Sequence, residues 1–157
     1  MYYSFVYPYL IYGNLIWGNA SSTALWPIYK LQKLAICIIT NTPRGKSTKL
    51  LCKKLRILRL PDIYSYNITI FIYKFKNNMM PPSLDHLFHT NNSIHRHNTR
   101  GASNLRAPRI RSLMAEKFIT TTGVHYWNLI ITKINTTLKI STFKQKLITH
   151  LLSEYLG

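Results

Sequence analysis

Residues 44–59, RGKSTKLLCKKLRILR, contain seven Lys or Arg residues and no Asp or Glu. A solvated surface helix usually mixes charges of both signs, because paired charges support it. A segment of one sign needs an anionic partner or a neutralising neighbour. We call these seven residues the basic stripe: Arg44, Lys46, Lys49, Lys53, Lys54, Arg56 and Arg59.

The same segment is expected to form a short helix. Ser47 or Thr48 is a suitable N-cap, and the helix would run to about residue 57. Residues three and four apart share one face of a helix. The basic face would contain Lys49, Lys53 and Arg56. The opposite, apolar face, which would anchor the stripe to a core, would contain Leu51, Leu55 and Leu58.

The whole chain has the same imbalance. Its 157 residues include 21 Lys and Arg against 4 Asp and Glu, a formal net charge of +17. That length suits one domain or a fragment of a larger protein. RNA or DNA backbone is the first candidate partner, and an acidic membrane surface is the second.

The acidic residues exclude most phosphoryl-transfer chemistry. Two-metal catalysis needs clustered carboxylates, and no two acids here are close in sequence. They are Asp62, Asp85, Glu116 and Glu154. There is no Gly-x-Ser-x-Gly run and no P-loop. We therefore expect no catalytic residues and no cofactor in this chain.

Metal binding is not expected either. Cys37 and Cys52 are too few for a disulfide framework or a Cys-based zinc site, which leaves free thiols in a reducing compartment. Four histidines could be drawn as a zinc site, but His-only structural sites are uncommon and polar loop histidines are the default interpretation. They are His86, His89, His95 and His97.

The first residues are apolar without the features of a targeting segment. Residues 2–17 lack a basic leader and a cleavage site, and Pro8, Gly13 and Asn14 interrupt them. We expect no membrane span and an intracellular, cytoplasmic or nuclear location. The segment predicts a helix that is apolar nearly all round and buried on most faces. Its tyrosines could form a base-stacking platform, although core packing is the favoured interpretation. They are Tyr2, Tyr3, Tyr7, Tyr9 and Tyr12.

The apolar periodicity predicts a mainly α fold, a bundle of about five to six helices with a possible short β-hairpin near residues 105–121. Further helices are expected at 23–40, with an apolar face of Leu25, Ile28, Leu31, Ala35 and Ile38; from Pro61 to about Phe75; around 123–130; and after a cap at Ser141. The last helix would bury Phe143, Leu147, Ile148, Leu151 and Leu152.

The composition divides the chain into three regions. A helical region at 1–80 precedes an irregular basic connection at 81–112 and a C-terminal hairpin or helical region at 113–157. The connection contains a second basic cluster, for which phosphate binding and plain surface charge remain equal alternatives. Its members are Arg96, Arg100, Arg106, Arg109 and Arg111.

Six runs in order resemble the part of non-LTR (LINE-type, jockey-like) retrotransposon polyproteins that follows the reverse-transcriptase palm and includes the thumb. They are YYSFVYPYLIYGNLIWGN at 2–19, LQKLAICIITNTPR at 31–44, LRILRLPDIY at 55–64, HNTRGASNLRAPRIRS at 97–112, GVHYWNLI at 123–130 and STFKQKL at 141–147. Together they cover nearly the whole chain.

The resemblance implies a fragment of an RNA-directed DNA polymerase. In that family the endonuclease domain and the catalytic aspartates of the palm lie upstream, and they would be partners in a longer polypeptide. The thumb grips the primer–template backbone, which is the role implied for the basic stripe. The chain departs from the family pattern at Leu129–Ile131, where Ser-Leu-Pro usually follows WN, and at Arg56, where a helix-ending Gly is common. Without that Gly the left-handed turn after the helix is harder to make.

Three other interpretations stay open. The basic surface could dock onto an acidic protein face, or the chain could be a decayed transposon relic without activity, or it could bind a membrane surface. Stripe protection by an acidic protein but not by duplex would favour the first, and dependence on anionic lipid would favour the last.

Overall fold

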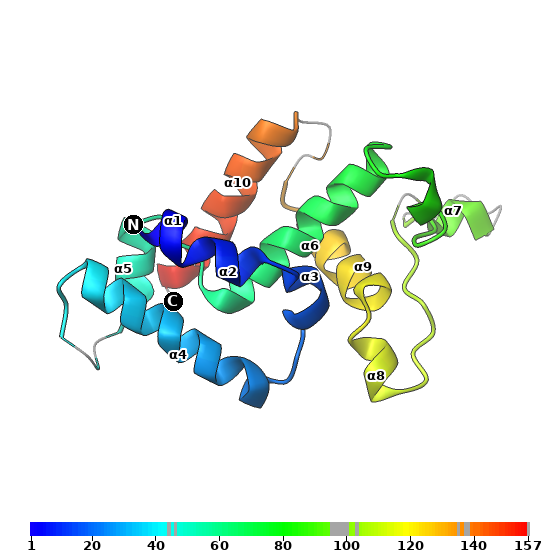
Figure 1. Cartoon of the computed structure of the whole chain (residues 1–157). Helices are drawn as coiled ribbons and strands as arrows, with labels where there is room; N and C mark the ends of the chain where they lie inside the picture. Colours follow the sequence, from blue (N-terminus) through cyan, green and yellow to red (C-terminus); the bar gives the residue numbers. More distant parts are fainter. Residues whose placement is uncertain are drawn as a thin grey trace. The chain divides into compact units, whose positions relative to one another are not determined.

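The computed structural model describes residues 1–43, 45, 47–94, 101–102, 104–134, 136 and 139–156 (Figure 1). Over these residues the chain is mainly helical and contains no β-strand, so the predicted fold class is confirmed. Among the described helices, five have six residues or more. They are α4 (Ser22–Ile39), α5 (Lys49–Lys54), α6 (Leu60–Lys76), α9 (Ile119–Ile130) and α10 (Ile140–Ser153).

Short helical pieces complete the fold. They are α1 (Tyr2–Phe5), α2 (Tyr7–Ile11), α3 (Asn14–Trp17), α7 (Asn91–Ile94), α8 (Leu113–Glu116) and the 3₁₀ turns η1 (Pro82–Leu84) and η2 (Glu154–Leu156). The helices predicted at 23–40, 61–75 and 123–130 are confirmed within a few residues at their ends. Helix α10 begins at Ile140, so Ser141 lies inside it and is not its cap.

The chain forms two compact units. Unit 1 contains Met1–Asn67 and Ile140–Gly157, and unit 2 contains Ile68–Lys139. Helix α6 contributes to both. The three-region division at 80 and 112 rests on composition and stays a prediction.

Unit 1 packs α10 and the start of α6 into one core. Phe143 and Leu147 of α10 are fully buried, and Leu151 and Leu152 are nearly so. The predicted apolar face of the last helix is therefore confirmed, with Ile148 at its half-buried margin.

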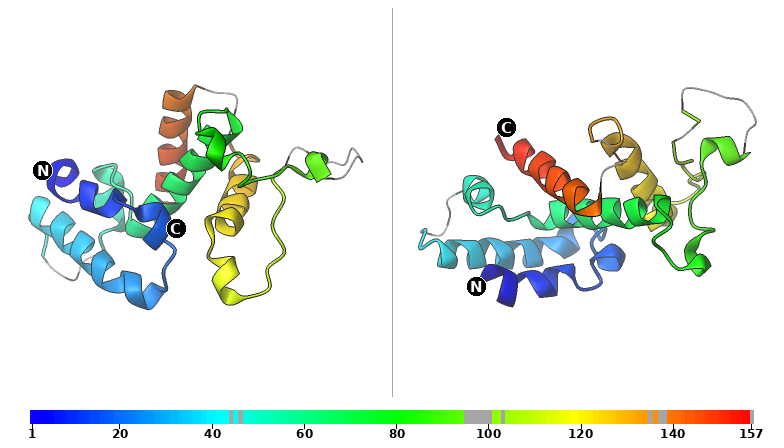
Figure 2. Two further views of the ribbon diagram at one scale, coloured as in Figure 1. Left: turned by 45° about the vertical axis from the view of Figure 1, so that its right-hand side comes forward. Right: turned by 90° about the horizontal axis from the view of Figure 1, so that it is seen from above.

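The predicted single helix at 2–17 is wrong. It is broken into α1, α2 and α3, which lie beside α4 (Figure 2). Pro8 has no amide hydrogen to continue a helix begun before it, and Gly13 has a left-handed φ of 60° that ends α2. Because short pieces turn in different directions, their apolar residues cannot all face one core.

The expected burial of this segment is also wrong. Tyr2 and Leu10 are buried, but Tyr9 and Tyr12 are 79% and 85% exposed. The exposed rings line an apolar groove of about 570 Å³ between these pieces and α4. The core interpretation holds for Tyr2 alone among the five tyrosines, since Tyr3 is also exposed and Tyr7 is only half-buried.

The buried face of α4 differs from the predicted one. Leu31 and Ile38 are 65% and 68% exposed, whereas Gln32, Ile36 and Cys37 are buried. Of the predicted face, Ile28, Leu31 and Ala35 line the groove. The buried Gln32 also lines it and supplies hydrogen bonds to Tyr2 and to the backbone of Leu58.

Unit 2 contains the connection that follows α6. The possible short β-hairpin near residues 105–121 is not formed, because the described residues of that range contain no strand, and α8 and the first turn of α9 lie in its second half. A single antiparallel bridge joins Thr90 to Leu105. The side chain of Asn128 on α9 accepts from Leu105 N at 3.2 Å and donates to Leu105 O at 3.0 Å. Asn128 thus satisfies the backbone groups that a second strand would have paired.

No membrane-spanning helix lies in the described ranges of the chain. None of the helices there combines the length and the apolar composition that crossing a bilayer requires.

Candidate nucleic-acid interface

Helix α5 positions the middle of the basic stripe. It begins after Thr48, whose side chain makes no cap hydrogen bond, and it ends at Lys54, three residues earlier than predicted. Cys52 is its most deeply buried residue, at 1% exposure. The predicted leucine face is only partly confirmed, since Leu58 is buried while Leu51 and Leu55 are half-buried. The anchors are Cys52, Ile57 and Leu58.

Arg56 makes the turn that ends α5. Its φ of 53° is left-handed. The amide of Ile57 donates to Cys52 O at 2.8 Å, and that of Arg56 donates to Lys53 O at 3.1 Å. This pair of bonds is the Schellman motif, in which glycine is the usual left-handed residue. The expected turn is therefore made without glycine, at the cost of a strained arginine backbone.

The first residues of the chain support this turn. The Tyr3 hydroxyl donates to the Arg56 carbonyl at 2.9 Å. Partial burial raises the pKa of Tyr3, and the nearby Arg56 charge opposes that rise. A residue far along the chain thereby holds the backbone from which the exposed Arg56 side chain extends.

Four stripe residues point into solvent or lie at its margin. Lys49, Lys54 and Arg56 are exposed, and Lys53 is half-buried. Arg44 and Lys46 lie outside the described residues. Over the described ranges, the ion pairs within 4 Å are Arg59–Asp62 and His150–Glu154. The four residues therefore carry charge that no described carboxylate compensates.

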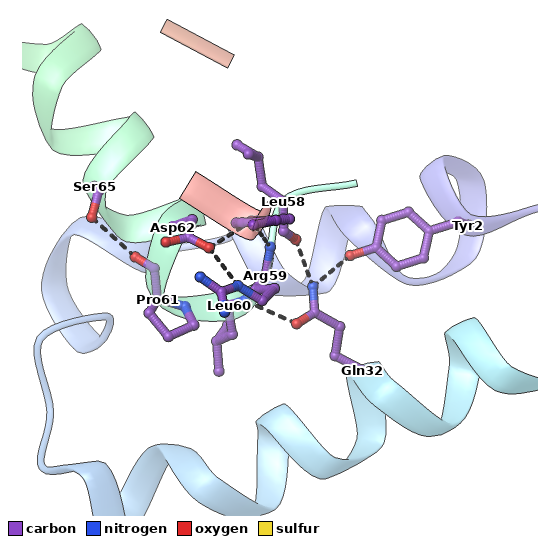
Figure 3. Close-up of polar contacts among 9 residues, drawn as sticks. Tyr2, Gln32, Leu58, Arg59, Leu60, Pro61, Asp62 and Ser65 are labelled. Atoms are coloured by element: carbon purple, nitrogen blue, oxygen red, sulfur yellow. Dashed lines mark hydrogen bonds and ion pairs between the residues drawn. The ribbon is translucent and has the colours of Figure 1, made fainter. Parts of the chain in front are cut away.

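Arg59 differs from the rest of the stripe. Its Nε donates to Asp62 Oδ2 at 2.9 Å (Figure 3). Its guanidinium lies 4.1 Å from the centroid of the Tyr155 ring. Desolvation lowers the pKa of Arg59, but Asp62 outweighs it, so the net pKa is above the ordinary value. Arg59 thus has a structural role in pairing α6 with the C-terminal turn.

A buried glutamine next to Arg59 was not predicted. Gln32 Nε2 donates to the Tyr2 hydroxyl at 2.8 Å and to Leu58 O at 2.9 Å, and Leu60 N donates to Gln32 Oε1 at 2.9 Å (Figure 3). Burial raises the pKa of Tyr2 to about 12, although its bond with Gln32 opposes the rise. A lone glutamine amid apolar residues in 23–40 was the available signal.

The second basic cluster belongs to unit 2. Arg106, Arg109 and Arg111 are exposed in a non-helical segment, and the amide of Arg106 donates to His89 O at 2.8 Å. Arg96 and Arg100 lie outside the described residues. In the structure, Arg106, Arg109 and Arg111 are near one another only because they are close in sequence.

The histidines do not form a described metal site. His86 and His89 are exposed, while His95 and His97 fall outside the described residues. In the described part of the chain, no group of three or more His, Cys, Asp or Glu side chains could hold a metal ion. Cys37 and Cys52 are free and buried.

A second group of cations lies on α4, outside the predicted site residues. Lys30 and Lys33 both lie over the ring of Trp26. They follow this exposed tryptophan by four and seven residues, spacings that place all three on one side of a helix, and this was the available sequence signal.

Comparisons with protein-family models, with curated proteins and with solved structures found no match to this chain.

Proposed function

We propose that the basic stripe binds the phosphate backbone of nucleic acid without sequence preference. The observation that carries the proposal is the uncompensated charge of Lys49, Lys53, Lys54 and Arg56 around a helix anchored by Cys52. Such cations neutralise phosphates and release counterions, which gives affinity that depends on salt and not on base sequence.

The proposed role is to hold a duplex for an active site that lies elsewhere, as the resemblance to a reverse-transcriptase thumb implies. This chain would then be a non-catalytic fragment of an RNA-directed DNA polymerase. The placement of Asp62 supports this, because its carboxylate pairs with the Arg59 guanidinium at 2.9 Å. A carboxylate held by a cation is poorly suited to bind a catalytic metal ion.

Arg59 is not proposed as a phosphate ligand in the folded protein. Its guanidinium already contacts Asp62 and the Tyr155 ring, and removing it would leave a half-buried carboxylate without its partner. The proposed ligands with described surroundings are Lys49, Lys53, Lys54 and Arg56.

The test is the salt dependence of duplex binding by a charge-reversal variant. Lys49→Glu, Lys53→Glu and Arg56→Glu together should weaken binding and flatten the slope of log affinity against log salt by about 3, since each lost phosphate contact removes roughly 0.9. Fluorescence anisotropy with a labelled blunt duplex gives both quantities.

The control must have the same net charge, because a chain at +17 binds any polyanion. The control variant reverses three exposed lysines outside the stripe, which changes the net charge by the same amount. Its substitutions are Lys133→Glu, Lys139→Glu and Lys146→Glu. Equal slopes in the two triple variants would contradict the assignment and leave only diffuse attraction.

A further inference from the structure

One flank of α4 combines two lysines with an exposed tryptophan and a half-buried tyrosine. Lys30 and Lys33 Nζ lie 5.5 and 5.4 Å from the Trp26 ring centroid, and Lys33 Nζ lies 4.5 Å from that of Tyr29. Residues at these spacings share one side of a helix. We call Trp26, Tyr29, Lys30 and Lys33 the aromatic–cation cluster.

The rings of this cluster remain open to a ligand. Trp26 is 48% exposed, although tryptophan is a highly buried residue on average. The Trp26 and Tyr29 centroids are 5.9 Å apart with planes tilted by 56°, so the rings do not stack flat on each other. The lysines reach them through flexible stems and can turn to a phosphate.

The cluster lies on the helix that contacts the end of the basic-stripe segment. Gln32 of α4, next to Lys33, donates to Leu58 O at 2.9 Å and accepts from Leu60 N at 2.9 Å, the residues on either side of Arg59. Burial raises the pKa of Tyr29, and the charge of Arg59 opposes that rise. The cluster and Arg59 therefore belong to the same part of unit 1.

An unpaired base is the ligand that fits this chemistry. Every base has a π-face that stacks on an aromatic side chain, and neighbouring cations pair with the phosphates. In a duplex those faces are covered by the adjacent base pairs. We propose that the aromatic–cation cluster binds single-stranded nucleic acid by stacking a base on Trp26, beside the duplex held by the stripe. This inference rests on the proposed function, since it assigns single-stranded nucleic acid, in addition to duplex, to the same basic surface.

The test separates base stacking from charge. Binding of an oligothymidylate is compared with binding of an abasic strand of equal length, which has the same phosphates and no bases. The wild-type protein should prefer the intact strand by about tenfold. Trp26→Leu should abolish that preference while leaving blunt-duplex affinity unchanged, and Trp26→Phe, which keeps a π-face, should retain most of it.

Leu31→Ala is the matched control on α4, because Leu31 is 65% exposed and lies outside the cluster. It should keep the full preference. No preference in the wild-type protein, or equal loss for both strands in Trp26→Leu, would overturn the inference. Displacement of the strand by phosphatidylserine vesicles, with no intact-to-abasic difference, would point instead to a lipid surface.

The stripe variant distinguishes the two proposals in the same assay. If its duplex affinity equals that of the charge-matched control while the Trp26 effect persists, the duplex proposal fails and the stacking site stands. If the stripe variant alone loses affinity and Trp26→Leu changes nothing, stacking fails and the duplex proposal stands.

Discussion

The Tyr155 hydroxyl donates to Asp62 Oδ2 at 2.5 Å, although 93 residues separate the two along the chain. The same hydroxyl oxygen accepts a hydrogen bond from the Arg59 amide at 2.9 Å. One phenol therefore ties the C-terminal turn to both the N-terminal end of α6 and the last residue of the stripe.

Tyr155→Phe should lower the free energy of unfolding by about 1–3 kcal/mol. The variant keeps the ring under Arg59 but leaves the Arg59 amide without its acceptor and Asp62 without one donor. Urea denaturation followed by far-UV circular dichroism measures the change. Tyr12→Phe is the control, since Tyr12 is 85% exposed and its change should stay within about 0.5 kcal/mol. Equal stability of the two variants would contradict the role given to Tyr155.

Gln32→Met should destabilise unit 1 by about 2–4 kcal/mol. Methionine matches the length of glutamine but leaves Leu58 O and Leu60 N without their hydrogen bonds to the side chain. The measurement is the denaturant midpoint of Gln32→Met. The control is Leu31→Met, at an exposed position on the same helix. A loss of stability no larger than that of Leu31→Met would mean that water replaces the hydrogen bonds of the Gln32 side-chain amide.

Arg56→Gly should raise the free energy of unfolding by about 1 kcal/mol, because glycine adopts the left-handed φ of 53° without steric cost. Thermal melts show this as an increase in Tm. Lys54→Gly, inside α5, should have the opposite effect by a similar amount. A lower Tm for Arg56→Gly would show that the side chain contributes more than its backbone strain costs.

Stability should fall in alkali. Burial, the largest cause at both residues, raises the pKa of Tyr2 and of Tyr66 from 10.0 to about 12. Above about pH 10 the unfolded chain loses phenol protons that the folded chain retains. The stabilising effect is thus complete below pH 10 and is lost as pH rises toward 12. The loss is up to about 1.4 kcal/mol per pH unit for each tyrosine.

Unfolding free energies across this range test the alkaline effect. Tyr2→Phe should decline less steeply than the wild-type protein, and Tyr12→Phe should follow the wild-type curve. Each variant removes a single phenol from the same protein, so the difference between the two curves isolates the contribution of Tyr2. Parallel curves for Tyr2→Phe and Tyr12→Phe would exclude Tyr2 as a source of the pH dependence.

Local patterns predicted the long helices well. The face of Phe143, Leu147, Leu151 and Leu152 is buried as expected because a periodic apolar face has one way to meet a core. The left-handed turn at Arg56 was expected only from the resemblance, in which a helix-ending Gly is common at this position, whereas the local pattern continued the helix to about residue 57. Of the predicted basic face, Lys49 and Arg56 lie on the surface and Lys53 is half-buried.

Other features depended on contacts that no local pattern encodes. Apolar residues in 2–17 and on α4 had more than one side on which to pack, and the short pieces α1–α3 left Tyr9, Tyr12 and Leu31 exposed. At the start of the segment expected to form a hairpin, both backbone groups of Leu105 bond to the side chain of Asn128, 23 residues further along the chain.

By itself, the amino-acid sequence determined that this protein is helical, strongly basic and short of acids, since composition and periodicity are local properties of the chain. Only the tertiary structure decided which charges remain free for a ligand. Arg59 and Arg56 are alike in sequence, yet one is held by Asp62 and Tyr155 while the other extends into solvent. The difference arises because a residue 93 positions beyond Asp62 returns to its carboxylate when the chain folds.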